Sequence, residues 1–191
     1  TTRRKWQNSI GYVPQNVFIA DSTLAENIAL GVDAQKIDRK RVGKVLEMAS
    51  LTKFVKGLAK GIETQVGELG CRVSGGERQR LVIARALLNS PEVILADEPT
   101  GNLDSATSQQ VLKILKNISK TNLVLIISHN YDDAMTYADR IIELSDGQIV
   151  KDFYGRNVPK PAHGTINIEH YTSSSSIIVE NITKLYDLVV I

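Results

Sequence analysis

The stretch Val93-Ile94-Leu95-Ala96-Asp97-Glu98 decides the fold of this chain, because it joins an apolar run to two adjacent carboxylates. A strand that is apolar throughout is typical of a parallel sheet covered on both faces. In open α/β sheets, ligands bind outside the carboxyl ends of the strands. The stretch therefore predicts a buried parallel strand that presents Asp97 and Glu98 at the ligand-binding edge of an α/β sheet.

The residues that follow extend this pattern to strand, helix, strand. A second apolar run, 123–127, ends in Ser128-His129, and a helical stripe closing at Ile118 lies between the two runs. A capping residue at Asp104 or Ser105 is expected to open that helix. Further on, an Asp-Gly pair typical of hairpin turns is flanked by apolar runs, at residues 141–144 and 148–150 around Asp146-Gly147.

The residues that precede the stretch are mostly helical in pattern. Thr23-Leu24-Ala25-Glu26 and Ser74-Gly75-Gly76-Glu77 both read as capping boxes that open helices. An apolar stripe and a short run between them predict two more helices, at residues 42–49 and 51–58. Because a strand candidate at 9–13 comes first, we expect an α/β domain into which a helical subdomain, about 22–90, is inserted.

Composition excludes several classes of protein. The chain has 191 residues, 42% of them hydrophobic and 23% charged, which is typical of a soluble domain with a core. A net charge of +2 gives no electrostatic case for nucleic acid, and no nucleic-acid partner is expected. Cys71 is the single cysteine, so neither an internal disulfide nor a cysteine-rich metal site is expected. No apolar run approaches the ~20 residues that span a bilayer.

Three groups are candidates for chemistry with nucleotide phosphates. Asp97 can hold Mg²⁺, and Glu98 can polarise an attacking water. Ser74-Gly75-Gly76 opens a helix, where unpaired N–H groups and small residues favour a phosphate. His129, one strand further along, can donate to a terminal phosphate. The structural alternatives are solvated acids at a strand exit, a simple helix cap and an ordinary surface histidine.

These groups belong to a set of five motifs that, taken together, resemble the nucleotide-binding domain of an ABC transporter. They stand in the family's order over about 9–152: the Q-loop, the signature, the Walker B strand with its glutamate, the D-loop and the switch histidine. In this chain the motifs are Val13-Pro14-Gln15, residues 73–77, residues 93–98, Gly101-Asn102-Leu103-Asp104 and Ser128-His129. Residues 22–28 and 64–70 resemble exporter-type domains, whereas residues 97–104 have a form that is more familiar from other branches of the ABC family.

The resemblance implies a P-loop NTPase-like parallel sheet and a role for each matching residue. Glu98 and His129 would be catalytic, and Asp97 and Gln15 would serve Mg²⁺. The residues implied in binding ATP are Gln15, Ser74, Gly75, Gly76, Glu77 and Asp104. Two such domains pair head to tail in the family, on the cytoplasmic face of a membrane beside a transmembrane subunit. The resemblance thus predicts an ATPase that drives export.

The family's phosphate loop, Gly-x-x-x-x-Gly-Lys-Ser/Thr, has no counterpart in the chain. The Gly43-Lys44 pair is followed by Val45 and lies in a helical stripe. We therefore expect the chain to begin inside the domain, as a partial ATPase domain over 1–152 that hydrolyses no ATP by itself.

Beyond this domain, residues 153–176 are predicted to be a linker, because Gly, Pro and Ser are frequent there. The tail at 177–191 resembles a strand, either the start of a second nucleotide-binding unit or a strand that pairs at the domain's own sheet edge.

Two other functions fit the same motifs. A soluble ABC-type ATPase without a membrane partner would use the same site, and co-purification with membrane-spanning subunits separates it from an exporter. A regulatory domain could supply the signature to a partner without catalysis, although Glu98 and His129 would then have little use.

Overall fold

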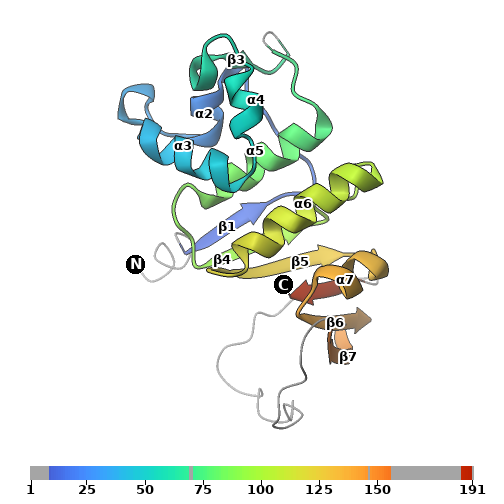
Figure 1. The fold of residues 1–191 in the computed structure, drawn as a ribbon. Coiled ribbons are helices and arrows are strands. Elements are labelled where there is room, and N and C mark those ends of the chain that lie inside the picture. Colours follow the sequence, from blue (N-terminus) through green and yellow to red (C-terminus); the bar gives the residue numbers. More distant parts are fainter. Residues whose placement is uncertain (1–8, 69–70, 146, 156–185, 191) are drawn as a thin grey trace.

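The computed structural model describes residues 9–68, 71–145, 147–155 and 186–190, and it forms an α/β domain with a six-stranded sheet (Figure 1). The order across the sheet is β1-β4-β5-β8-β6-β7. These strands are β1 (Ile10–Val13), β4 (Val93–Asp97), β5 (Leu123–Ser128), β8 (Tyr186–Val190), β6 (Arg140–Ser145) and β7 (Gln148–Tyr154). A small second sheet pairs β2 (Ser22–Thr23) with β3 (Gln65–Val66). The predicted α/β class with a P-loop NTPase-like parallel core is confirmed.

The parallel part of the sheet consists of β1, β4 and β5. Val13 lies opposite Ala96, and Asp97 opposite Ile127, so the three strands end at the same edge. On β4, Ile94 and Ala96 are fully buried, whereas the alternate residues are half-buried. The sequence predicted that both faces of β4 are buried. Only the face that carries Ile94 and Ala96 is fully buried, and the other face is half-buried.

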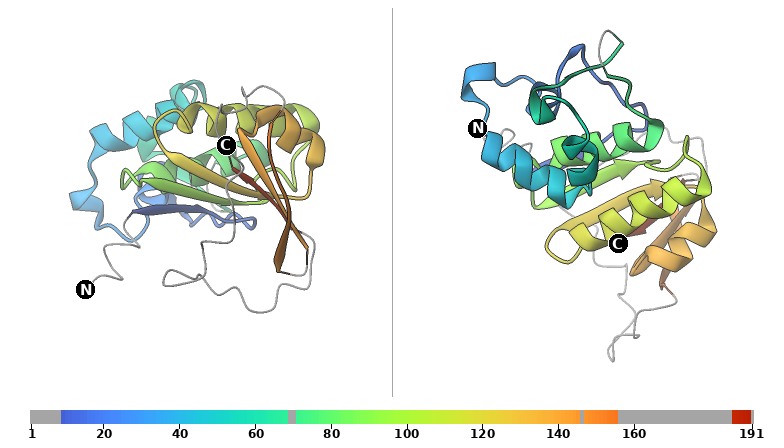
Figure 2. Two further views of the ribbon diagram at one scale, coloured as in Figure 1. Left: turned by 90° about the horizontal axis from the view of Figure 1, so that it is seen from below. Right: turned by 45° about the horizontal axis from the view of Figure 1, so that its top comes forward.

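The predicted helical subdomain precedes β4 and lies to one side of the sheet (Figure 1). Its capping boxes are confirmed at Thr23 and Ser74, where the side chain accepts from the backbone and Glu26 or Glu77 bonds back. The helices are α2 (Leu24–Ile28), α3 (Arg39–Met48), α4 (Thr52–Lys56) and α5 (Gly75–Leu87), followed later by α6 (Ser105–Ile118) and α7 (Tyr131–Tyr137). The helices gather on one side of the sheet in the left view of Figure 2.

Helix α5 joins the two parts, because it contacts α2 and α3 as well as β1 and α6. Its Arg85 donates to the carbonyl oxygens of Asn27 at 2.8 Å and Phe18 at 3.1 Å. Burial lowers the pKa of Arg85. Asn27 is itself buried and bonds both backbone groups of Ala20. These two side chains hold the segment after β1 against α5.

The C-terminal strand β8 lies inside the sheet, antiparallel to both β5 and β6. Residues 186–190 of the tail therefore pair inside the domain's own sheet and not at its edge, and the start of a second nucleotide-binding unit stays a prediction. Strand β7 runs to Tyr154, two residues into the predicted linker. Residues 156–185 lie outside the described residues, so the linker and the domain boundaries stay predictions.

The described residues contain no helix that is both long and apolar enough to cross a bilayer.

The β6–β7 pair predicts a pH dependence of stability. Arg140 donates to both carboxylate oxygens of Asp152, at 2.8 and 2.5 Å, and these bonds hold the pKa of Asp152 below its ordinary 3.8. A lowered folded pKa gives stability that is present above the unfolded pKa and lost as pH falls through the folded value. At pH 7 we expect Asp152→Asn to unfold at a clearly lower urea concentration than wild type. The difference between the two urea midpoints should narrow towards pH 3. An equal gap at both pH values would contradict this.

Candidate functional site

Three predicted site residues meet at the carboxyl ends of the parallel strands. Gln15 follows β1, Glu98 follows β4 and His129 follows β5. Gln15 Nε2 donates to Glu98 Oε2 at 2.8 Å, and His129 Nδ1 lies 3.1 Å from Glu98 Oε1. The Glu98 side chain is 17% exposed and that of His129 is 67% exposed. Both carboxylate oxygens of Glu98 therefore have a polar neighbour from an adjacent strand.

The backbone of Glu98 is strained. Its φ of 41° lies in the left-handed region, which for a non-glycine residue costs about 1–3 kcal/mol. Its N–H donates to the carbonyl of Ile127 at 2.9 Å, which fixes the residue to β5. A Cβ on Gly101 would lie 3.2 Å from Glu98 Oε2, so glycine leaves room for the carboxylate. The loop holds Glu98 in one position at the expense of its own stability.

Asp97 faces a different neighbour from Glu98. The hydroxyl of Tyr12 donates to Asp97 Oδ2 at 3.3 Å. Partial burial, with a further contribution from Asp97, raises the pKa of Tyr12. The side chains of Asp97 and Glu98 thus have different neighbours. This suits the two roles predicted for them, binding of Mg²⁺ and polarisation of water.

The predicted magnesium residues offer oxygen donors of the type that Mg²⁺ prefers, a carboxylate on Asp97 and an amide on Gln15. The part of the chain that the structure describes holds no group of three or more His, Cys, Asp or Glu placed for a metal. Mg²⁺ commonly binds one or two carboxylates together with water and substrate phosphates, and so needs no complete protein cage. The residues fit a nucleotide-associated ion.

The N-terminus of α5 is a closed cap. Ser74 donates to Glu77 Oε2 through its N–H at 2.8 Å and its hydroxyl at 2.7 Å, and Glu77 N–H donates back to Ser74 Oγ at 3.3 Å. Gly75 is exposed and lines the same pocket as Glu98. Gly76 is buried, and a Cβ there would collide with the methyl group of Thr107. Glycine at 76 therefore serves close packing of α5 on α6.

Asp104 caps α6. It accepts from Thr107 N–H at 3.0 Å and from Thr107 Oγ1 at 2.6 Å, and these bonds lower the pKa of Asp104. Since Thr107 also touches Gly76, this cap fixes the starts of α5 and α6 together.

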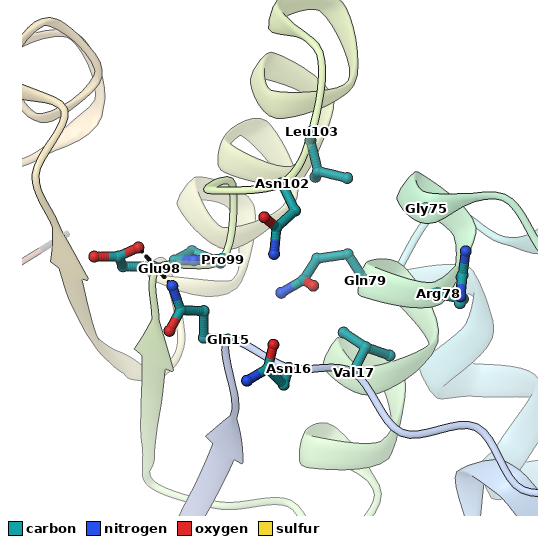
Figure 3. Close-up of a pocket in the computed structure, with 10 residues that line it drawn as sticks. All are labelled: Gln15, Asn16, Val17, Gly75, Arg78, Gln79, Glu98, Pro99, Asn102 and Leu103. Atoms are coloured by element: carbon teal, nitrogen blue, oxygen red, sulfur yellow. Dashed lines mark hydrogen bonds between the residues drawn. The ribbon is translucent and has the colours of Figure 1, made fainter.

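Glu98 lies between two pockets. The first, of about 230 Å³, opens on the Gln15 side and also contains Asn16, Gln79 and Asn102 (Figure 3). The second, of about 320 Å³, opens on the His129 side and is mainly polar. Its other polar side chains are Thr100, Ser105, Ser108, Ser128, Asn130 and Asp133.

Sequence reasoning missed Tyr12 and two amides of the first pocket, Asn16 and Gln79. Gln79 had a detectable signal, because it falls on the same buried face of α5 as Val82 and Ile83, three and four residues on. For Tyr12 the signal is the alternation of β1, which turns it away from the buried Val13.

The fold and the acidic edge of its sheet define a P-loop NTPase-like α/β domain with a helical subdomain. The family model described as ABC transporter matches residues 1–101. This chain belongs to the ABC transporter family, and its relatives identify it as an exporter-like nucleotide-binding domain.

Two relatives and one solved structure illustrate this likeness. The ATP-dependent lipid A-core flippase of Ralstonia nicotianae is 40% identical over 146 residues, which cover 76% of this chain and 24% of the relative. A multidrug resistance ABC transporter ATP-binding and permease protein of Lactococcus lactis is 37% identical over 144 residues, 75% of this chain and 24% of the relative. A bacterial Atm1-family ABC exporter with ATP bound aligns at TM-score 0.64 and 31% identity, over 78% of this chain and 26% of that one. The chain thus spans about a quarter of the length of these relatives.

The packing of Gly76 on Thr107 gives a test by double substitution. Gly76→Ala alone should destabilise the protein, because the new Cβ meets the Thr107 methyl group. In a Thr107→Ser background, which keeps the hydroxyl and removes that methyl, the same change should be neutral or stabilising by up to about 1 kcal/mol through helix propensity. Urea unfolding of the four proteins measures this. Equal destabilisation in both backgrounds would show that Thr107 is not the obstacle.

Proposed function

We propose that this domain binds ATP with Mg²⁺, hydrolyses it, and couples hydrolysis to export across a membrane as part of a larger ABC transporter. The observation that supports it most is the position of Glu98, held between Gln15 and His129 at the ends of adjacent strands. Relatives described as flippase and multidrug transporter favour a membrane exporter over the soluble alternative.

In this proposal Glu98 is the general base. The attacking water adds to the γ-phosphorus, its proton passes to the Glu98 carboxylate, and the bond from the γ-phosphorus to the ADP oxygen breaks. The bond from Gln15 leaves Glu98 Oε2 a second lone pair for the water. Mg²⁺, near Asp97 and Gln15, would supply positive charge to the phosphates.

His129 would steady the transferring phosphoryl group. The oxygens of an ionised carboxylate only accept hydrogen bonds, so beside ionised Glu98 the His129 Nδ1 acts as the donor. Its Nε2 can then donate to a phosphate oxygen only when the ring carries both protons.

The signature residues would act on ATP held by a second nucleotide-binding domain. Gly75 is exposed at the N-terminus of α5, a helix of 13 residues whose first N–H groups favour an anion. Ser74 and Glu77 would shape this end through their cap, and Asp104 would hold it against α6. Because these residues would act on ATP held by the other domain, the proposal implies two nucleotide-binding domains arranged head to tail.

A transmembrane partner would dock in a groove of about 720 Å³ between the segment after β1 and the residues before α5. Phe18 is 63% exposed beside it, and Val17 and Ile19 add apolar surface. Val17 and Arg78 line both this groove and the pocket beside Glu98. Docking would therefore act on the same segment that carries Gln15.

Catalysis is tested by Glu98→Gln in the full protein that carries this domain. Loss of the base should lower kcat for ATP at least about 100-fold and leave ATP binding intact. Glu92→Gln is the matched control, an exposed glutamate before the same strand. Turnover measured by phosphate release and binding measured by calorimetry separate the two effects. Full turnover by Glu98→Gln would overturn the assignment.

Docking is tested by Phe18→Ala. Removal of the exposed ring should weaken co-purification with the membrane-spanning part about tenfold or more, by loss of buried apolar area. Leu30→Ala is the control, since Leu30 is 49% exposed and lies outside the groove. Equal losses for both variants would refute the groove as the docking site.

A further inference from the structure

The pocket beside Glu98 contains the buried amide side chain of Gln79. Gln79 is 5% exposed, and its Nε2 finds no hydrogen-bond partner among the described residues. Figure 3 shows the side chain leaving α5 and pointing into the pocket, towards Asn102, Gln15 and Asn16. A buried amide without a partner is unfavourable, and such groups are commonly satisfied by ordered water.

The pocket offers many polar groups to water, alongside the apolar side chains of Val17, Pro99 and Leu103. Four amide side chains line it, and Arg78 and Glu98 add one charge of each sign. Its volume of about 230 Å³ is several times the ≈ 30 Å³ that one water molecule occupies in the liquid. Amides both donate and accept, so they can bind water in many orientations.

We propose that this pocket is a water site in which the Gln79 amide holds ordered water beside Gln15 and Glu98. Gln79 is then a positioning residue for the water that Glu98 activates, a role that rests on the proposed function of Glu98. The Gln15 amide lies 2.8 Å from Glu98 Oε2, so water in this pocket is next to the base. Because Gln79 sits in the second turn of α5, the amide is carried by a rigid element.

The test compares Gln79→Met with wild type in the full protein. Met has nearly the same shape as Gln but offers no N–H donor. We expect kcat for ATP to fall about three- to tenfold, as for one lost hydrogen bond, with KM for ATP unchanged. We also expect the Tm not to rise, because the amide is satisfied by water in wild type. Gln110→Met, on the exposed face of α6, should match wild type in all three measurements.

A rise of several degrees in the Tm of Gln79→Met would overturn the proposal, because it would mean that the amide is truly unsatisfied. An unchanged kcat would overturn the positioning role. If Glu98→Gln abolishes turnover while Gln79→Met does not reduce it, the proposed function stands and this inference fails; if Glu98→Gln is active, the proposed function itself fails.

A crystal structure that orders solvent gives a second measurement, independent of whether the variant folds. Water within hydrogen-bonding distance of Gln79 Nε2 supports the proposal. A protein group bonded to that amide in place of water overturns it.

Discussion

The parallel pairing of β1, β4 and β5 is the constraint on which the rest of the structure depends. Its register brings Val13 beside Ala96 and Asp97 beside Ile127, so the residues after the three strands are neighbours although they are about 30 to 80 positions apart in the chain. Shifting one strand along its neighbour would separate Gln15 or His129 from Glu98. The buried alternate residues Ile94 and Ala96 oppose such a shift, because a one-residue slip would turn them to the other face.

Helix α5 supplies the second constraint. One end carries the exposed Gly75 and packs through Gly76 on Thr107, whereas Arg85, near the other end, holds the carbonyls of Phe18 and Asn27. Ten residues of helix, about 15 Å, separate Gly75 from Arg85. Helix α5 thus contributes Arg78 to both the groove and the pocket, and it packs through Gly76 on the start of α6.

Much of the fold follows from local sequence, since capping boxes and apolar runs depend on residues within a few positions of each other. Thr23 and Ser74 cap as predicted, and the strands after Pro91 and Asn122 begin where their apolar runs do. The interior place of β8 between β5 and β6 could not be predicted, because strand neighbours in a sheet are chosen by long-range pairing. The same applies to the site: motif order indicated Gln15, Glu98 and His129, but the contact of Tyr12 with Asp97 and the burial of Gln79 arise only when distant segments meet.

The geometry around Glu98 also explains how the proposed catalytic base can tolerate backbone strain. A left-handed backbone at a glutamate is unfavourable, yet three independent bonds fix it: its N–H to Ile127, and its carboxylate to Gln15 and to His129. Two of these bonds lead to β5 and the residue directly after it, and the third leads to the segment after β1, so Glu98 is held from both neighbouring strands of β4. A base held in this way loses little freedom when a substrate arrives, and a preorganised base needs less reorganisation in the transition state. Strain in the loop is thus balanced by the pairing of the three strands, because that pairing places Gln15, Ile127 and His129 beside Glu98 at their common edge.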